Sequence, residues 1–153
     1  MLNGKPIQIL LVEDDAAHAD IVRRNLGESR IANHIVHLAD GQAALDYLCR
    51  QGPDAPPAEA PRPDMILLDL RLPKVDGQEV LKRLKGDPEL STIPVVVLTT
   101  SKTELDIVTA YGNGAGSYLV KPVDFTKFTQ LMETFGFYWL AWNQFPHASS
   151  TAS

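Results

Sequence analysis

Five short, apolar-rich runs recur along the chain, and segments with a helical spacing of apolar residues separate them. The runs are residues 7–12, 34–38, 65–68, 95–98 and 117–120. Runs of this kind are typical of strands covered on both faces, which occur in parallel sheets with helices on each side. Right-handed connections between successive strands then build a doubly wound sheet. The alternation therefore predicts an α/β fold, a doubly wound five-stranded parallel sheet.

A proline-rich segment interrupts this alternation before the third run. Residues 51–63 hold five of the eleven prolines of the chain. Because proline fixes φ and has no N–H to donate, we expect an exposed, semi-extended loop inserted between a helix and a strand. The expected organisation is one domain over residues 1–146, with the insertion at 51–63, a C-terminal helix at 124–144 and a polar tail at 147–153.

Composition argues against nucleic acid as a partner, a membrane span and an intrachain disulfide. The formal net charge is −5, which disfavours nucleic acid as a partner because binding to the phosphate backbone needs positive charge. No apolar run approaches the ~20 residues of a membrane span. The single cysteine, Cys49, excludes an intrachain disulfide and is expected to be a small buried hydrophobe. The four histidines show no metal-site spacing and are expected to be surface or core residues. A cytoplasmic location follows as the default expectation.

Polar residues suited to phosphoryl chemistry follow four of the five runs. Glu13 and Asp14 follow the first, Asp69 the third, Thr99 the fourth and Lys121 the fifth. In a doubly wound sheet the carboxyl ends of the strands line one crevice, so we expect these side chains to converge. Taken singly, each residue also fits a turn, a helix cap or a loop, as Asp15 fits the cap of the first helix. It is the joint placement that indicates a site.

The three carboxylates are expected to hold a cation, because like charges packed together repel. Oxygen ligands suit Mg²⁺, which keeps several waters and shares other positions with a phosphate. Asp69 is then the candidate nucleophile for forming an aspartyl phosphate. Lys121 would neutralise phosphoryl oxygens and the Thr99 hydroxyl would donate to one of them. No glycine-rich loop follows the first run, which disfavours a nucleotide site.

Four segments resemble the receiver domains of two-component response regulators. They are ILLVEDD near the N-terminus, DMILLDLRLPKVDG around Asp69, IPVVVLTTS around Thr99 and GSYLVKP around Lys121. The resemblance spans roughly residues 5 to 135. It implies a (βα)5 flavodoxin-like fold and a signalling function in which Asp69 accepts a phosphoryl group from a histidine kinase. Such a protein is not an enzyme, beyond self-catalysed phosphorylation and dephosphorylation.

The same resemblance implies what individual residues do. The implied metal ligands are Glu13, Asp14, Asp69 and the backbone carbonyl of Arg71. Lys121 matches the lysine that contacts the phosphoryl group. Thr99 matches the switch hydroxyl, and Tyr118 matches the aromatic residue that turns inward on activation.

A narrower likeness concerns the proline-rich insertion and the C-terminal segment FGFYWLAWNQFP. Both resemble single-domain regulators paired with phytochrome-type photoreceptor kinases, which implies a kinase partner of that type. The C-terminal helix is apolar almost all round between Phe137 and Trp142, and one small domain covers only one side of such a helix. We expect a homodimer through this helix. Folding back over its own domain and docking of the kinase are the alternatives.

Three other functions match parts of the pattern. An aspartate-nucleophile phosphatase of the haloacid dehalogenase type needs a second Asp two residues after the nucleophile, where this chain has Arg71. A phosphorylation-independent adaptor usually lacks the acceptor, an acidic residue or the lysine, and this chain has all of them. A DNA-binding regulator needs an output domain, whereas one predicted helix and a polar tail follow Lys121. The phosphoacceptor regulator accounts for the whole pattern.

Overall fold

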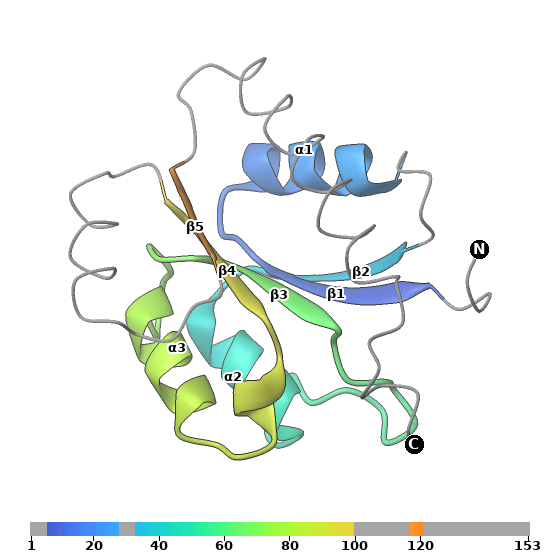
Figure 1. Ribbon diagram of the computed structural model, residues 1–153, viewed down its shortest axis with the longest axis vertical. Helices are drawn as coiled ribbons and strands as arrows, with labels where there is room; N and C mark the ends of the chain where they lie inside the picture. The colour runs from blue at the N-terminus through green and yellow to red at the C-terminus, as the bar shows by residue number, and fades with distance from the viewer. Residues whose placement is uncertain (1–5, 28–32, 100–116, 121–153) are drawn as a thin grey trace.

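The computed structural model describes residues 6–27, 33–99 and 117–120, and the elements in these ranges alternate as the sequence predicts (Figure 1). They are β1 (Ile7–Val12), α1 (Ala16–Gly27), β2 (Asn33–Leu38), α2 (Gly41–Cys49), β3 (Met65–Asp69), α3 (Gly77–Lys85), the 3₁₀ helix η1 (Leu90–Thr92), β4 (Val95–Thr99) and β5 (Ser117–Val120). None of the helices in the described ranges is long and apolar enough to cross a membrane.

The strands form one five-stranded sheet in the order β2-β1-β3-β4-β5, with all described pairs parallel. Val12 at the end of β1 lies opposite Leu38 of β2 and Leu68 of β3, and Asp69 lies opposite Leu98 of β4. After β2, the chain crosses to the other side of β1 and adds β3, β4 and β5 there, so the strand order reverses between β1 and β3. This is the point in a doubly wound sheet where a ligand crevice forms. The predicted fold class is confirmed.

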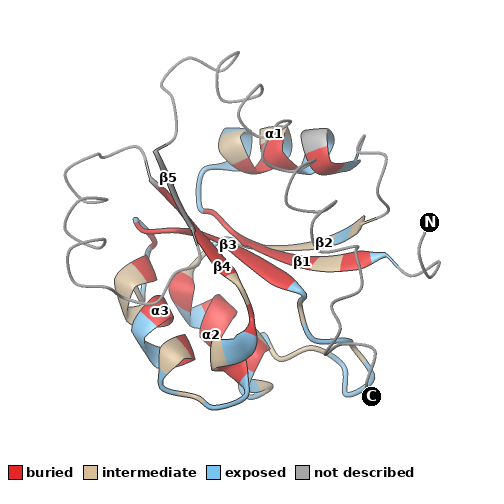
Figure 2. Ribbon diagram, viewed as in Figure 1, coloured by how far each residue is buried: buried red, intermediate tan, exposed pale blue. Residues whose placement is uncertain are grey.

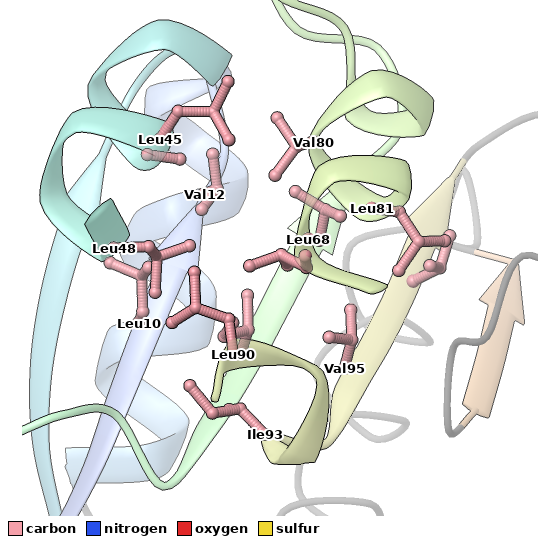
Figure 3. Close-up of a cluster of buried hydrophobic side chains, with 14 of the residues drawn as sticks. Leu10, Val12, Leu45, Leu48, Leu68, Val80, Leu81, Leu90, Ile93 and Val95 are labelled. Carbon is pink, nitrogen blue, oxygen red and sulfur yellow. The ribbon is translucent and has the colours of Figure 1, made fainter. Parts of the chain in front are cut away.

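Helices cover both faces of the sheet. In Figure 1, α1 lies above the sheet, and α2 and α3 lie below it. Figure 2 shows that buried residues line both interfaces. The side of α2 and α3 is filled by a cluster that includes Leu10, Val12, Leu45, Leu68, Val80 and Leu81 (Figure 3). The side of α1 is filled by Ile9, Leu11, Ala19, Val22 and Leu67, among others. Alternate residues of β1 and β3 thus enter opposite cores, which explains why these runs are apolar throughout.

Aspartates fix the starts of α1, α2 and α3. The carboxylates of Asp15, Asp40 and Asp76 accept hydrogen bonds from the backbone N–H groups of Ala17, Ala43 and Glu79, at 2.9, 2.7 and 3.0 Å. Each carboxylate thereby satisfies a donor that has no partner inside the helix. The expectation that Asp15 caps the first helix is confirmed.

Two local features differ from the expectations or were not anticipated. Cys49 is exposed, so the expectation of a buried small hydrophobe is wrong. It follows buried Leu48 and lies about 100° round the helix from it, away from the stripe that faces the sheet. The 3₁₀ helix η1 was not predicted from the sequence. Asp87 supports it by accepting the N–H groups of Glu89 and Leu90 at 2.9 and 3.1 Å.

Residues 50–64 join α2 to β3 without helix or strand, and most of them are exposed. The guanidinium of Arg50, at the end of α2, donates to the carbonyl oxygens of Pro57, Ala58 and Ala60 and so holds the loop together. Asp64 connects the end of this loop to β1. Its backbone N–H donates to the carbonyl oxygen of Gln8 at 2.6 Å, and its carboxylate accepts the N–H of Gln8 at 2.8 Å. The predicted helix at 124–144 and the tail at 147–153 lie outside the described residues.

Candidate functional site

Three carboxylates meet at the C-terminal edge of the sheet. Glu13 and Asp14 directly follow β1, and Asp69 is the last residue of the neighbouring strand β3. One oxygen atom from each of the three lies within 4.8 Å of the other two. The sheet register explains this meeting, because Val12 and Leu68 are paired and the chain carries a carboxylate just beyond each of them.

The surroundings of the three carboxylates differ. Glu13 is 1% exposed and Asp69 is 6% exposed, whereas Asp14 is exposed. Carboxylates that are buried beside one another repel unless a cation lies between them. Oxygen donors at this spacing suit a hard divalent cation, which completes its coordination with water. The arrangement is therefore that of a cation site with one open side.

Several contacts fix the backbone around Asp69. Its Oδ1 accepts the N–H of Arg71 at 2.9 Å, and the next residue, Leu70, accepts the N–H of Gly77 at 2.9 Å. Gly77 begins α3 so close to the end of β3 that a Cβ atom there would lie 2.3 Å from the Asp69 carbonyl oxygen. A glycine is therefore needed at this position. These contacts place the Asp69 carboxylate on a rigid part of the fold rather than on a free loop.

An open depression of about 400 Å³ adjoins the carboxylates. Its lining residues are Asp14, Leu70, Arg71, Leu72, Pro73, Asp76 and Gln78. Asp14 thus belongs both to the carboxylate cluster and to the outer surface. Enclosed apolar pockets are typical of small-molecule sites, and this depression is neither enclosed nor mainly apolar. An open site of this kind is suited to a donor group presented by another protein.

The other predicted residues are placed in part. The backbone of Thr99 ends β4, and the backbone of Tyr118 lies in β5, paired with Val97. Both strands run parallel to β3, so their carboxyl ends lie at the same edge of the sheet as Asp69. The side chains of Thr99 and Tyr118, and the whole of Lys121, lie outside the described residues. Their convergence with the carboxylates, and metal binding by the Arg71 carbonyl, stay predictions.

One contact at the site was missed by the reasoning from sequence. The ring nitrogen Nε2 of His37, in β2, lies 2.8 Å from the backbone carbonyl oxygen of Glu13. The sequence places His37 near the end of its apolar run. Its partner could be recognised only once the register of β1 and β2 was known, because Glu13 lies 24 residues away along the chain.

Comparison with known proteins decides the family. The model of the response regulator receiver domain matches residues 9–133. The chain belongs to this family. The match includes Glu13, Asp14 and Asp69, together with Thr99 and Lys121. Receiver domains are signalling modules, in agreement with the sequence-based expectation of a response regulator.

Two sequence relatives extend over nearly the whole chain. The "Probable methanogenesis regulatory protein FilR2" of Methanothrix harundinacea is 46% identical over 142 residues, which cover 92% of this chain and 88% of that protein. Response regulator Rcp1 of Synechocystis is 41% identical over 138 residues, covering 90% of this chain and 92% of Rcp1. The likeness therefore extends well beyond the short motifs around the carboxylates.

Solved structures give the same relationship. The Mn²⁺-bound form of Rcp1 matches with a TM-score of 0.81 at 41% identity, over 88% of this chain and 95% of that one. The phosphorylated cyanobacterial phytochrome response regulator RcpA matches with a TM-score of 0.81 at 39% identity, over 90% and 96% of the two chains. The chain is thus related to phytochrome response regulators, one of which has been seen with a divalent cation and one in phosphorylated form.

Proposed function

We propose that this chain is a phosphoacceptor response regulator of a two-component phosphorelay that takes a phosphoryl group from a histidine kinase onto Asp69. The observation that carries the proposal is the meeting of Asp69 with Glu13 and Asp14 at the C-terminal edge of the sheet. The phosphorylated state of the relative RcpA supports it. The chain is proposed as an acceptor and not as a phosphatase, because Arg71 stands where such an enzyme carries its general acid.

In the proposed step, a carboxylate oxygen of Asp69 attacks the phosphorus of a phosphohistidine, in line with the P–N bond. The new P–O bond forms as the P–N bond breaks. The electron pair of the P–N bond stays on the histidine nitrogen, so a phosphohistidine ring that is protonated on its other nitrogen departs as neutral imidazole. Glu13 and Asp14 would hold Mg²⁺ together with Asp69 and the carbonyl of Arg71. Bound Mg²⁺ supplies neutralisation of the charge on the phosphoryl oxygens. Lys121 and the Thr99 hydroxyl are proposed to contact those oxygens.

Phosphorylation by acetyl phosphate in the presence of Mg²⁺ tests the proposal, with phosphate-affinity electrophoresis as the readout. The wild-type chain is expected to accept one phosphoryl group, and EDTA is expected to prevent this. Asp69→Asn keeps the shape but removes the nucleophile, so it should stay unmodified.

Asp76→Asn is the matched control. Asp76 lines the same depression, but its carboxylate caps α3, and asparagine caps a helix equally well. This variant should accept the phosphoryl group as the wild type does. Full modification of Asp69→Asn would show that the acceptor lies elsewhere and would contradict the proposal.

Thr99 and Tyr118 are proposed to couple phosphorylation to the surface of the protein. Their strands, β4 and β5, are neighbours in the sheet. The phosphoryl oxygens would draw the Thr99 hydroxyl inward, and the Tyr118 ring would turn into the space that this opens. A bound group shifts such an equilibrium only through contacts that differ between the two states.

Thr99→Ala should therefore accept the phosphoryl group but lose the change in the Tyr118 ring resonances that follows it. Thr99→Ser keeps the hydroxyl and should retain the change. Identical Tyr118 resonances in the phosphorylated and unphosphorylated wild-type protein would show that this switch does not operate.

As the partner we propose a phytochrome-type histidine kinase in the cytoplasm, with no membrane or nucleic-acid partner. The likeness to Rcp1 and RcpA supports the kinase class. Phosphoryl transfer from an autophosphorylated cyanobacterial phytochrome is expected to be faster than transfer from a histidine kinase without a photoreceptor domain. Equal or slower transfer from the phytochrome would contradict this choice of partner.

A further inference from the structure

His37 binds the backbone of the acidic pair from the edge strand β2. Its Nε2 lies 2.8 Å from the carbonyl oxygen of Glu13. A carbonyl oxygen only accepts hydrogen bonds, so Nε2 carries the proton and donates. The next residue of β2, Leu38, accepts the N–H of Glu13 at 3.0 Å. Two consecutive residues of β2 therefore hold the backbone N–H and the backbone C=O of Glu13.

The carbonyl that His37 binds is where the chain leaves the sheet. The paired register of β1 ends at Val12, and Glu13 is the first residue beyond it. The Glu13 carbonyl belongs to the peptide unit that connects Glu13 to Asp14. Because that unit is planar, the direction of its C=O bond fixes where the N and Cα atoms of Asp14 lie.

This restraint matters more for Asp14 than for Glu13. The Glu13 side chain is buried and also accepts the N–H of Asp15 at 3.2 Å, so its surroundings restrain it. Asp14 is exposed, and burial contributes little to its position. The His37 hydrogen bond to the preceding peptide unit is therefore a contact that sets the starting point of the Asp14 side chain relative to Asp69.

We propose that His37 is a positioning residue for the divalent cation site: by holding the Glu13–Asp14 peptide plane, it keeps the two carboxylates arranged for the cation. This inference rests on the proposed function, since it assigns the carboxylates to a metal. His37 itself is proposed to touch neither the cation nor the phosphoryl group. Groups that orient metal ligands through hydrogen bonds typically change metal affinity by about 10- to 100-fold when removed.

Titration of the metal-free full chain with Mn²⁺, followed by loss of the free-ion EPR signal, measures the effect. His37→Leu removes the donor and is expected to weaken Mn²⁺ binding by about 10-fold. His37→Gln places an amide N–H the same number of bonds from Cβ, so it should restore most of the affinity. Urea unfolding of each variant in EDTA provides the comparison of stability without metal.

His34→Leu is the matched control. His34 lies on the same strand, and its Nδ1 lies 3.2 Å from the Gln8 side chain at the opposite end of the β1–β2 pair. Its replacement should leave Mn²⁺ affinity unchanged. If loss of a histidine contact between β2 and β1 changed Mn²⁺ affinity only by lowering the stability of the fold, His37→Leu and His34→Leu would show similar Mn²⁺ affinities.

Equal Mn²⁺ affinity of the wild type and His37→Leu would overturn the inference, and so would a loss in His37→Gln as large as that in His37→Leu. If His37→Leu does not fold, His37→Gln is compared with His37→Asn, whose amide is one bond shorter; equal affinities of these two would also overturn it. Acetyl phosphate labelling of the same wild-type sample tests the proposed function separately. A protein that binds Mn²⁺ but accepts no phosphoryl group on Asp69 would refute that function, while the affinities would still decide the inference about His37.

Discussion

Asp40 and Gly41 connect the start of α2 to the loop that follows Asp69. The carboxylate of Asp40 accepts the N–H of Ala43, and the Nζ atom of Lys74 lies 3.7 Å from its other oxygen. The N–H of Gly41 donates to the carbonyl oxygen of Pro73 at 3.2 Å. The loop between β3 and α3 is therefore fastened to the start of α2. Substitutions at Asp40 and Gly41 therefore test the contact between α2 and this loop.

Gly41→Ala is expected to lower the free energy of unfolding by about 1–3 kcal/mol. A Cβ atom at Gly41 would lie 1.7 Å from the carbonyl oxygen of Val75, so the loop would have to move. Gly27→Ala is the matched control, because nothing lies within 4 Å of a Cβ atom there. In the helix α1 it should be neutral or stabilising by up to about 1 kcal/mol. Urea unfolding measures both variants. An unchanged free energy of unfolding in Gly41→Ala would contradict the close contact between Gly41 and the Val75 carbonyl.

Asp40→Ala removes the cap of α2 and should cost about 1 kcal/mol of unfolding free energy. The ion pair with Lys74 adds little to this, because the Lys74 side chain is 69% exposed. Asp40→Asn keeps an oxygen acceptor for the Ala43 N–H and should retain nearly full stability. Chemical denaturation of the wild type, Asp40→Ala and Asp40→Asn measures these differences in the free energy of unfolding. A loss in Asp40→Asn equal to that in Asp40→Ala would mean that charge, and not capping, stabilises this helix end.

In the helix α3, the buried apolar side chains and the exposed ion pair are expected to contribute very differently to stability. Val80, Leu81 and Leu84 are fully buried in the core between α3 and the sheet, and Figure 3 labels the first two. Glu79 and Arg83 form an exposed ion pair at 3.0 Å on the other side of the helix. Leu81→Ala should lower the free energy of unfolding by about 2–5 kcal/mol, because it leaves a cavity in the core. Glu79→Gln should cost less than about 0.5 kcal/mol, since exposed pairs of this spacing contribute little. Similar losses in the two variants, measured by urea unfolding, would contradict this picture of α3.

The elements were predictable where burial leaves a pattern along the chain. The strand β1 is apolar throughout because Leu10 and Leu11 enter different cores, and such a run is visible in the sequence. Asp69 could be predicted at the end of β3 because a charge directly after an apolar run marks the end of burial. The hydrogen bond of His37 could not, because it depends on which strand lies beside β2. Cys49 was misjudged because residue type alone does not tell on which side of a helix a residue lies.

At the scale of the whole molecule, we propose that two copies associate through the segment 124–144, which lies outside the described residues. The proposal rests on the sequence, in which Phe137, Tyr138, Trp139, Leu140 and Trp142 follow one another closely. A two-fold dimer is the commonest arrangement that covers such a surface. Sedimentation equilibrium of the full chain should give a dimer, and a truncation after Gly136 should give a monomer. A full-length chain that stays monomeric at concentrations of tens of micromolar would contradict the dimer.

The chain is expected to form a single domain that is followed by a short polar tail. The family match ends at residue 133, and we propose that the domain extends over residues 1–146 with a polar tail at 147–153. Limited proteolysis is expected to remove the tail and to leave the rest of the chain uncut outside residues 51–63. The proline-rich loop is the expected second site, because most of its residues are exposed. Early cleavage inside 124–144 would contradict the proposed helix.

Asp69, and no other carboxylate of the cluster, is proposed to receive the phosphoryl group. Borohydride reduces an aspartyl phosphate to homoserine, so reduction of the phosphorylated chain followed by peptide mass spectrometry locates the acceptor directly. We expect homoserine at position 69, formed only when both Mg²⁺ and the phosphodonor are present. Homoserine at Asp14 or Asp76, with Asp69 unchanged, would contradict it.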